Sequence, residues 1–236
     1  MSVDRSKTPK KARAPRRFPP SVAGSCLRYA VMEVLGFGRL IAPDSLDAMR
    51  QGSEQHKRFQ HQLLQENALA EVEVPLKDEE WGVSGRLDAL LETARGPWVV
   101  EYKTVSDERF ERVRESGPMI SHWAQLQLYL AVGHFVGGSL VVDSRPENRR
   151  LIFHAEPDLQ WNTWIRARIL RVKNFQATRK LPEREVSQAC LACDRWQRCF
   201  RTEDERTAQV AIHPMWEPSP PLPGDMRFVA GADIVS

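Results

Sequence analysis

Residues 98–104 read Trp-Val-Val-Glu-Tyr-Lys-Thr, an apolar and β-prone run that carries one acid and one base. This composition predicts a strand. Alternate residues of a strand project from the same face, so we expect Glu101 and Lys103 to point the same way. A Glu-x-Lys strand usually forms a solvated pair of charges at the surface. Burying ionised groups on so apolar a strand costs free energy unless a function requires it. The second interpretation is therefore that Glu101 and Lys103 belong to a catalytic or metal-binding site.

The preceding run, residues 81–91, also has strand character and contains Asp88. Residues 92–97 between the two runs read Glu-Thr-Ala-Arg-Gly-Pro, which is turn composition. Two strands joined by such a turn predict an antiparallel hairpin. The hairpin would bring Asp88 beside Glu101.

Two carboxylates with a lysine are typical of a site for a hard divalent cation such as Mg²⁺ or Mn²⁺. His56, in the phrase Gly52-Ser-Glu-Gln-His56, would add an imidazole ligand, which favours Mn²⁺ over Mg²⁺. Phosphodiester hydrolysis suits this set of groups. The cation would activate a water, and the Lys103 ammonium would position that water or stabilise developing negative charge.

The remaining elements surround this hairpin. Hydrophobic periodicity and turn signals predict helices over 21–35, 45–67, 121–135 and 158–179, and further strands over 71–76, 140–144 and 150–154. The second of these helices has an expected apolar stripe of Leu46, Met49, Phe59, Leu63 and Leu64. The fold class is therefore α/β or mixed α+β, with a mixed central sheet flanked by helices.

Charge separates the ends of the chain from its middle. Residues 1–20 contain three lysines, four arginines and one aspartate, whereas the other residues contain 27 basic and 30 acidic side chains. We expect residues 1–20 to form a disordered basic tail. Residues 201–236 have five prolines between Pro214 and Pro223 and predict a loosely structured extension.

Composition excludes a membrane protein, because the most apolar stretch, residues 126–142, is interrupted by Gln127, His134 and three glycines. The start of the chain has no apolar core of a secretory signal. We therefore expect a cytoplasmic protein that makes no contact with a membrane.

Three of the four cysteines lie close together, at Cys190, Cys193 and Cys199, and the fourth, Cys26, lies far upstream. Three thiolates in one loop need a fourth ligand in most structural metal sites, and Cys26 is the candidate. The spacing fits Zn²⁺ or an iron–sulfur cluster equally well. A Cys190–Cys193 disulfide is disfavoured in a reducing compartment.

These features occur in a fixed order along the chain. The order is Gly52-x3-His56, Gly85-x2-Asp88, Glu101-x-Lys103 and Gln125-x3-Tyr129, with Cys26 before them and Cys190, Cys193 and Cys199 after them. The series resembles the RecB-like branch of the PD-(D/E)XK nuclease superfamily. Within that branch it is most similar to the CRISPR-associated RecB-like exonucleases and to the iron–sulfur nuclease domains of AddB-type helicase–nucleases. The resemblance covers about residues 21–200 and implies a restriction-endonuclease-like nuclease domain over that range.

The resemblance also implies roles for the residues of the site. His56, Asp88 and Glu101 would ligate the metal together with the main-chain carbonyl of Tyr102, and Lys103 would be the catalytic lysine. Leu87 stands where the family motif has a proline. This difference leaves the chemistry intact.

In the same family, Gln125 and Tyr129 orient the lysine or hold the DNA backbone, and their spacing puts both on one helix face. The four cysteines would bind a [4Fe-4S] cluster, which would join the N- and C-terminal parts of the domain. Because folding would depend on the cluster, loss of one ligand should destabilise the whole domain.

The implied function is a metal-dependent DNA exonuclease that acts on ends, on single strands and with 5′ to 3′ polarity. Its implied setting is CRISPR spacer acquisition beside an integrase complex. A phage or chromosomal recombination or repair nuclease is the alternative setting, and a non-catalytic DNA-binding scaffold and a zinc-ribbon interaction protein are alternatives of other classes. The sequence has no Gly-x4-Gly-Lys-Ser/Thr phosphate loop, so an ATP motor would come from a partner helicase.

Overall fold

The computed structural model describes residues 16–41, 43–66, 69–145, 149–212, 228–229 and 234. A mixed sheet lies at its centre, with the strands side by side in sequence order. The strands are β1 (Ala70–Asp78), β2 (Val83–Thr93), β3 (Gly96–Val105), β4 (Gly137–Ser144), β5 (Arg150–Ala155) and β6 (Phe228–Val229). Strands β3 and β4 are parallel, and each other neighbouring pair is antiparallel. The expected fold class is confirmed.

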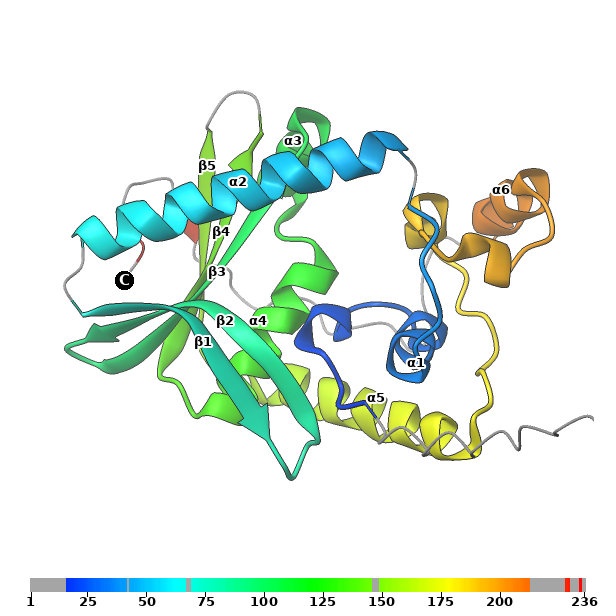
Figure 1. Ribbon diagram of the computed structural model, residues 1–236, viewed down its shortest axis with the longest axis horizontal. Helices are drawn as coiled ribbons and strands as arrows, with labels where there is room; N and C mark the ends of the chain where they lie inside the picture. Colours follow the sequence, from blue (N-terminus) through cyan, green and yellow to red (C-terminus); the bar gives the residue numbers. More distant parts are fainter. Residues whose placement is uncertain are drawn as a thin grey trace, which may run out of the picture.

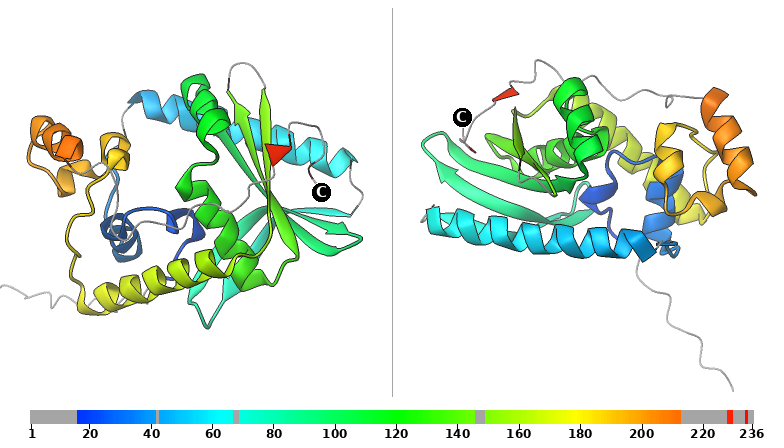
Figure 2. Two further views of the ribbon diagram at one scale, coloured as in Figure 1. Left: turned by 180° about the vertical axis from the view of Figure 1, so that it is seen from behind. Right: turned by 90° about the horizontal axis from the view of Figure 1, so that it is seen from above.

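Helices cover both faces of this sheet. The helices of the described residues are η1 (Pro20–Val22), α1 (Leu27–Leu35), α2 (Pro43–Glu66), α3 (Asp107–Ser116), α4 (Ile120–Gly133), α5 (Leu159–Thr178), η2 (Gln188–Ala192), η3 (Trp196–Arg198) and α6 (Glu203–Ile212), of which η2, η3 and α6 lie away from the sheet (Figure 1). Helix α2 crosses one face, and α3, α4 and α5 lie on the other, so that the sheet is the middle layer (Figures 1 and 2). No helix within the described ranges is both long and apolar enough to cross a bilayer.

Strand β2 changes face partway along its length. Val83 and Leu87 pack in the core on the α4 side, whereas Ala89 and Leu91 pack with Phe59 of α2 on the opposite side. All four β2 positions are odd-numbered, so a regular strand would place them on one face. The strand therefore turns over between positions 87 and 89, which are the neighbours of Asp88.

The predicted helix over 21–35 is two elements in the structure. Residues Pro20–Val22 form η1, and α1 begins only after Cys26, whose Sγ accepts a hydrogen bond from the Tyr29 amide at 3.3 Å. The break occurs at Gly24, where the main chain touches the start of α4. A Cβ atom there would lie 2.5 Å from Ser121 Cα.

Gly24→Ala is expected to destabilise the protein by about 1–3 kcal/mol, because the added methyl group meets main-chain atoms that cannot rotate away. Urea denaturation measures the change. Gly38→Ala is the matched control, since a Cβ at Gly38 would have no neighbour within 4 Å among the described residues. Equal stability of the two variants would contradict the close approach.

The ends of the chain differ from expectation where the structure describes them. Phe18 belongs to the expected tail, yet it is buried, and its backbone pairs with β2 through Gly82 and Ser84. The ring of Phe18 fills a core position, so this part of the expected tail belongs to the folded domain. In the expected C-terminal extension, residues 203–212 form α6 and bury Val210. Residues 1–15 and 213–227 lie outside the described residues.

The expected apolar stripe of the second helix is correct only for its C-terminal half. Phe59 and Leu63 of α2 are buried against the sheet, whereas Leu46 and Met49 are each 54% exposed and Leu64 is 44% exposed. The N-terminal half of α2 extends past the sheet toward η2, so it has no strand to cover (Figure 1).

Candidate functional site

The site forms where β2 and β3 separate. Their ladder runs from the turn to the pair Ala89↔Val100 and goes no further. Beyond it the two strands diverge (Figure 1). At this point the amide of Tyr102 has no main-chain acceptor on β2 and donates instead to the side chain of Asp88, at 2.8 Å from Oδ2. The carboxylate is thereby fixed beside Glu101, as the hairpin predicted.

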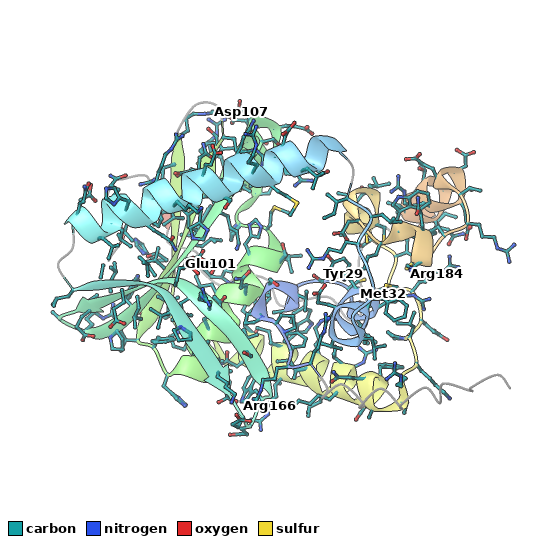
Figure 3. The ribbon with its side chains drawn as sticks, viewed as in Figure 1. Tyr29, Met32, Glu101, Asp107, Arg166 and Arg184 are labelled. Atoms are coloured by element: carbon teal, nitrogen blue, oxygen red, sulfur yellow. The ribbon has the colours of Figure 1, made fainter. Side chains whose placement is uncertain are left out.

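Glu101 lies on β3 between the sheet and α4 (Figure 3). Its side chain is fully buried, and neither carboxylate oxygen accepts a hydrogen bond within the described residues beyond an ion pair with Lys103. Burial raises the pKa of Glu101 to about 7, in spite of the opposing charge of Lys103. The nearby charge of Asp88 adds to the increase.

Lys103 completes the set on β3, and its side chain is 26% exposed. Burial lowers its pKa, but the charges of Glu101 and Asp88 outweigh that effect, so the pKa of Lys103 lies above its usual value. The pKa of Asp88 is raised by burial, against the opposing charges of Lys103 and His56. Lys103 is therefore a cation held between two carboxylates.

His56 reaches the site from α2. Its Nε2 atom is 3.4 Å from Asp88 Oδ1 and is buried with no hydrogen bond within the described chain. The ring lies 5.5 Å from that of Tyr102, on which Phe59 is stacked at 4.3 Å. Tyr102 in turn donates to Asp143 Oδ2 at 2.9 Å. Tyr102 of β3 thus contacts both His56 and Phe59 of α2 and thereby fixes the position of His56 relative to β3.

Gln125 and Tyr129 reach the site from α4 on the opposite face. Gln125 Nε2 donates to Tyr129 Oη at 2.9 Å, and Tyr129 Oη donates to the carbonyl of Arg86 at 2.8 Å. Both hydrogen bonds lead to the main chain of β2 just before Asp88. The pair is therefore bonded to β2 two residues before Asp88, and the roles that the resemblance implies for Gln125 and Tyr129 stay predictions.

His122 is a residue of the site that motif spacing missed. Burial lowers its pKa to about 3, and the positive charges of Lys103 and Arg109 lower it further, so the imidazole is neutral. It lies on α4 one turn before Gln125, and this spacing is the signal that points to it. Because the imidazole is neutral, it does not compete with the Lys103 ammonium as a cationic partner of Glu101 and Asp88.

The donor set suits a hard divalent cation. Glu101 Oε2 is buried without a hydrogen bond in the described part of the chain, whereas Oε1 is paired with Lys103 and the buried Nε2 of His56 lies 3.4 Å from Asp88 Oδ1. Buried polar atoms without partners are rare unless something absent satisfies them. Oxygen donors with one imidazole fit Mn²⁺ or Mg²⁺. No three His, Cys, Asp or Glu side chains among the described residues are already close enough to hold a metal ion, so binding would require the ligands to draw together.

The four cysteines converge at the other side of the molecule. Cys26 is the N-cap of α1, and burial raises its pKa to about 12, with smaller contributions from Glu185, Cys193 and Cys190. The pKa of Cys193 is raised to about 11, again by burial first. These thiols would resist ionisation without a cation or cluster. Among the described residues, no three of these thiols lie close enough together to hold a metal ion.

The cysteine loop, residues 182–200, is docked on α1. Arg195 is 2% exposed, donates to Glu33 Oε2 at 2.6 Å and to the carbonyl of Phe37 at 2.9 Å, and lies over the ring of Tyr29. Figure 3 labels Tyr29 on α1 and Arg184 on the neighbouring segment. Polar contacts thus join the two segments that carry the cysteines.

Comparisons with known proteins agree on the fold. Residues 27–200 match the family model described as the PD-(D/E)XK nuclease superfamily. None of the curated proteins compared with the chain is a match.

Among solved structures, SSO0001 is 20% identical with a TM-score of 0.53, over 80% of this chain and 88% of that one. LHK-Exo in complex with dAMP is 14% identical with a TM-score of 0.51, over 69% and 90%. The alkaline exonuclease LHK-Exo from Laribacter hongkongensis also matches, at 12% identity and a TM-score of 0.47 over the same shares.

Proposed function

The chain belongs to the PD-(D/E)XK nuclease superfamily, and we propose that it is a metal-dependent exonuclease that hydrolyses phosphodiester bonds at the ends of DNA. One observation carries the proposal. Asp88 and Glu101 meet where β2 and β3 separate, with Lys103 beside them. An ordinary surface pair of charges needs no fully buried glutamate. A bound cation would compensate the charge of such a buried carboxylate.

The ligands of the cation are His56, Asp88, Glu101 and the main-chain carbonyl of Tyr102. When bound, Mg²⁺ or Mn²⁺ would supply positive charge that stabilises the phosphate and lowers the pKa of a water molecule. Asp88 is held for this role by the Tyr102 amide, and Glu101 by the core around it. The chain itself therefore fixes where a phosphate can approach.

Lys103 has the role of the catalytic lysine. Its raised pKa keeps the ammonium charged, and its partial exposure leaves it open to a phosphate or a water. A fixed cation stabilises the negative charge that develops during hydrolysis more strongly than it stabilises the ground state. His122, which stays neutral, does not repel the Lys103 ammonium.

Action at single-stranded ends with 5′ to 3′ polarity is the form of the activity that we propose. The polarity and the strand preference follow from the resemblance to the CRISPR-associated RecB-like exonucleases, and the similarity of fold to LHK-Exo, solved in complex with dAMP, supports a nuclease activity. The nuclease fold itself supports DNA as the partner molecule.

We further propose that Cys26, Cys190, Cys193 and Cys199 bind a [4Fe-4S] cluster. The docking of the cysteine loop on α1 and the mutual electrostatic influence of the thiols support one shared site. Such a cluster would contribute to folding instead of to chemistry. Zn²⁺ is the alternative occupant, because four thiolates suit both.

The proposed setting is CRISPR spacer acquisition in the cytoplasm, beside an integrase complex or a helicase. A reducing compartment suits four free cysteines. Recombination or repair in a phage or chromosome is the alternative setting. Integrase genes next to the gene for this chain would support the first setting, and recombination genes the second.

A substrate comparison tests the proposed activity. The protein, purified without oxygen, is incubated with linear and with circular single-stranded DNA in the presence of Mn²⁺. Mononucleotide release from linear DNA alone, stopped by a chelator, is the expected result. Cleavage of the circle would indicate an endonuclease, and binding without cleavage of either DNA would indicate a scaffold.

Mn²⁺ binding is expected to weaken by about tenfold for each pH unit below 7 and to level off above it. The reason is that the pKa of Glu101 is raised to about 7, so below this pH the cation must displace a proton. Calorimetric titration across this pH range measures the dependence. Constant affinity between about pH 8 and pH 6 would contradict the burial effect, whereas at lower pH the imidazole ligand His56 must also lose a proton to bind the cation.

A further inference from the structure

Glu73 has an unusual backbone. It is the one non-glycine residue within the described strands that has a positive φ, at 55°. Such a conformation costs of order 1–3 kcal/mol and persists only where the surroundings enforce it. Glu73 lies on β1 opposite Asp88, between the pairs Val72↔Ala89 and Val74↔Leu87. The strain is therefore located where β2 turns over, at a proposed metal ligand.

One side chain connects the strained residue to Asp88. Gln60 of α2 is 8% exposed, and its Nε2 donates to Glu73 Oε1 at 2.9 Å and to the main-chain carbonyl of Asp88 at 3.0 Å. Arg86 binds the other Glu73 oxygen at 3.3 Å. The hydrogen bond from Gln60 is the largest cause of the lowered pKa of Glu73, which keeps this carboxylate ionised as an acceptor.

Helix α2 thereby contacts Asp88 at two points. His56 and Gln60 are four residues apart and share a helix face. His56 lies beside the carboxylate of Asp88, and Gln60 binds its carbonyl. From the opposite face, Tyr129 binds the carbonyl of Arg86. The segment that carries Asp88 is thus held from both sides of the sheet.

We infer that Gln60 and Glu73 are positioning residues that fix Asp88 relative to His56 and thereby set the affinity of the site for its divalent cation. The inference rests on the proposed function. Neither residue is a metal ligand, because both Glu73 oxygens are engaged by Gln60 and Arg86. Residues that orient metal ligands typically contribute 10–100-fold to affinity or activity.

Calorimetric titration of the intact protein with Mn²⁺ tests this inference. Gln60→Leu is expected to bind Mn²⁺ roughly 10–100-fold more weakly than the unmodified protein. Gln62→Leu is the matched control, because Gln62 is exposed on the same helix and contacts only Glu66 in the described hydrogen bonds. We expect this control to bind Mn²⁺ normally.

Substitution of Glu73 separates positioning from stability. Glu73→Gly is expected to melt near the unmodified protein, because glycine adopts a φ of 55° freely while it loses more backbone entropy. It should nevertheless bind Mn²⁺ more weakly, since Gln60 loses its acceptor. Glu73→Gln keeps an acceptor oxygen and should restore the affinity. This pair decides the question even if Gln60→Leu does not fold.

The outcomes are distinguishable. Normal Mn²⁺ affinity in folded Gln60→Leu, or in Glu73→Gly, would overturn the positioning role and leave the proposed function intact. Failure of the unmodified protein to bind Mn²⁺ would overturn the proposed function and this inference with it.

Discussion

Replacement of Lys103 with alanine is expected to slow the cleavage of single-stranded DNA by on the order of 10²–10³-fold while Mn²⁺ still binds. The ammonium lies next to Glu101 and is not itself a metal ligand. Its loss removes stabilisation of developing charge but no donor atom. Single-turnover rates at saturating Mn²⁺ measure the effect.

Lys77→Ala is the matched control for this experiment. Lys77 is also a strand lysine paired with a glutamate, but it is exposed on β1 and distant from the carboxylates of the site. It should cleave DNA normally. An equal loss in both variants, or an unchanged rate in Lys103→Ala, would remove Lys103 from the mechanism.

Cys199→Ser is expected to lower the melting temperature by about 10 °C or more, equivalent to roughly 3–5 kcal/mol for a chain of this size. A serine hydroxyl does not replace a thiolate, so the cluster is lost, and its contribution to folding is lost with it. The absorbance of the iron–sulfur cluster should disappear in the same variant. Thermal melting and a visible spectrum measure both effects.

Ala192→Ser tests whether the position of the substitution matters. Ala192 is exposed on the same loop, so its variant should retain both colour and stability. If the purified protein is colourless and contains zinc, the cysteines bind Zn²⁺ instead of an iron–sulfur cluster. A Cys199→Ser variant as stable as the control would show that the four cysteines do not form one site.

Much of the site was predictable because it depends on local patterns. Strand periodicity placed Glu101 and Lys103 on one face, and the turn at 92–97 set the register that brings Asp88 to them. His56 also reaches the site as expected. These relations depend on strand geometry and on short connections, which sequence spacing reports directly.

The supporting residues were not predictable, because distant segments determine them. The sequence of β1 alternates regularly through Glu73 and gives no sign of a positive φ. The side chain of Glu73 is bound by Gln60, which comes from a different element, so this contact leaves no trace in the sequence of β1. Likewise, the sequence around Phe18 is typical of a basic tail, and only the folded structure shows that its ring occupies a core position.

The helices that the sequence did not predict are mainly polar. Helix α3 buries Phe110 and Val113, and its other side chains are wholly or partly exposed. Helix α6 buries Arg206 and Val210. Two buried positions in ten residues give too weak a period to distinguish a helix from a loop.

Anomalous X-ray diffraction from crystals of the protein soaked in Mn²⁺ tests the proposed metal site most directly. We expect a strong peak bounded by His56, Asp88 and Glu101, and loss of that peak in Asp88→Asn. Mn²⁺ bound only elsewhere, or no peak at these three side chains, would contradict the assignment of a metal-dependent nuclease site.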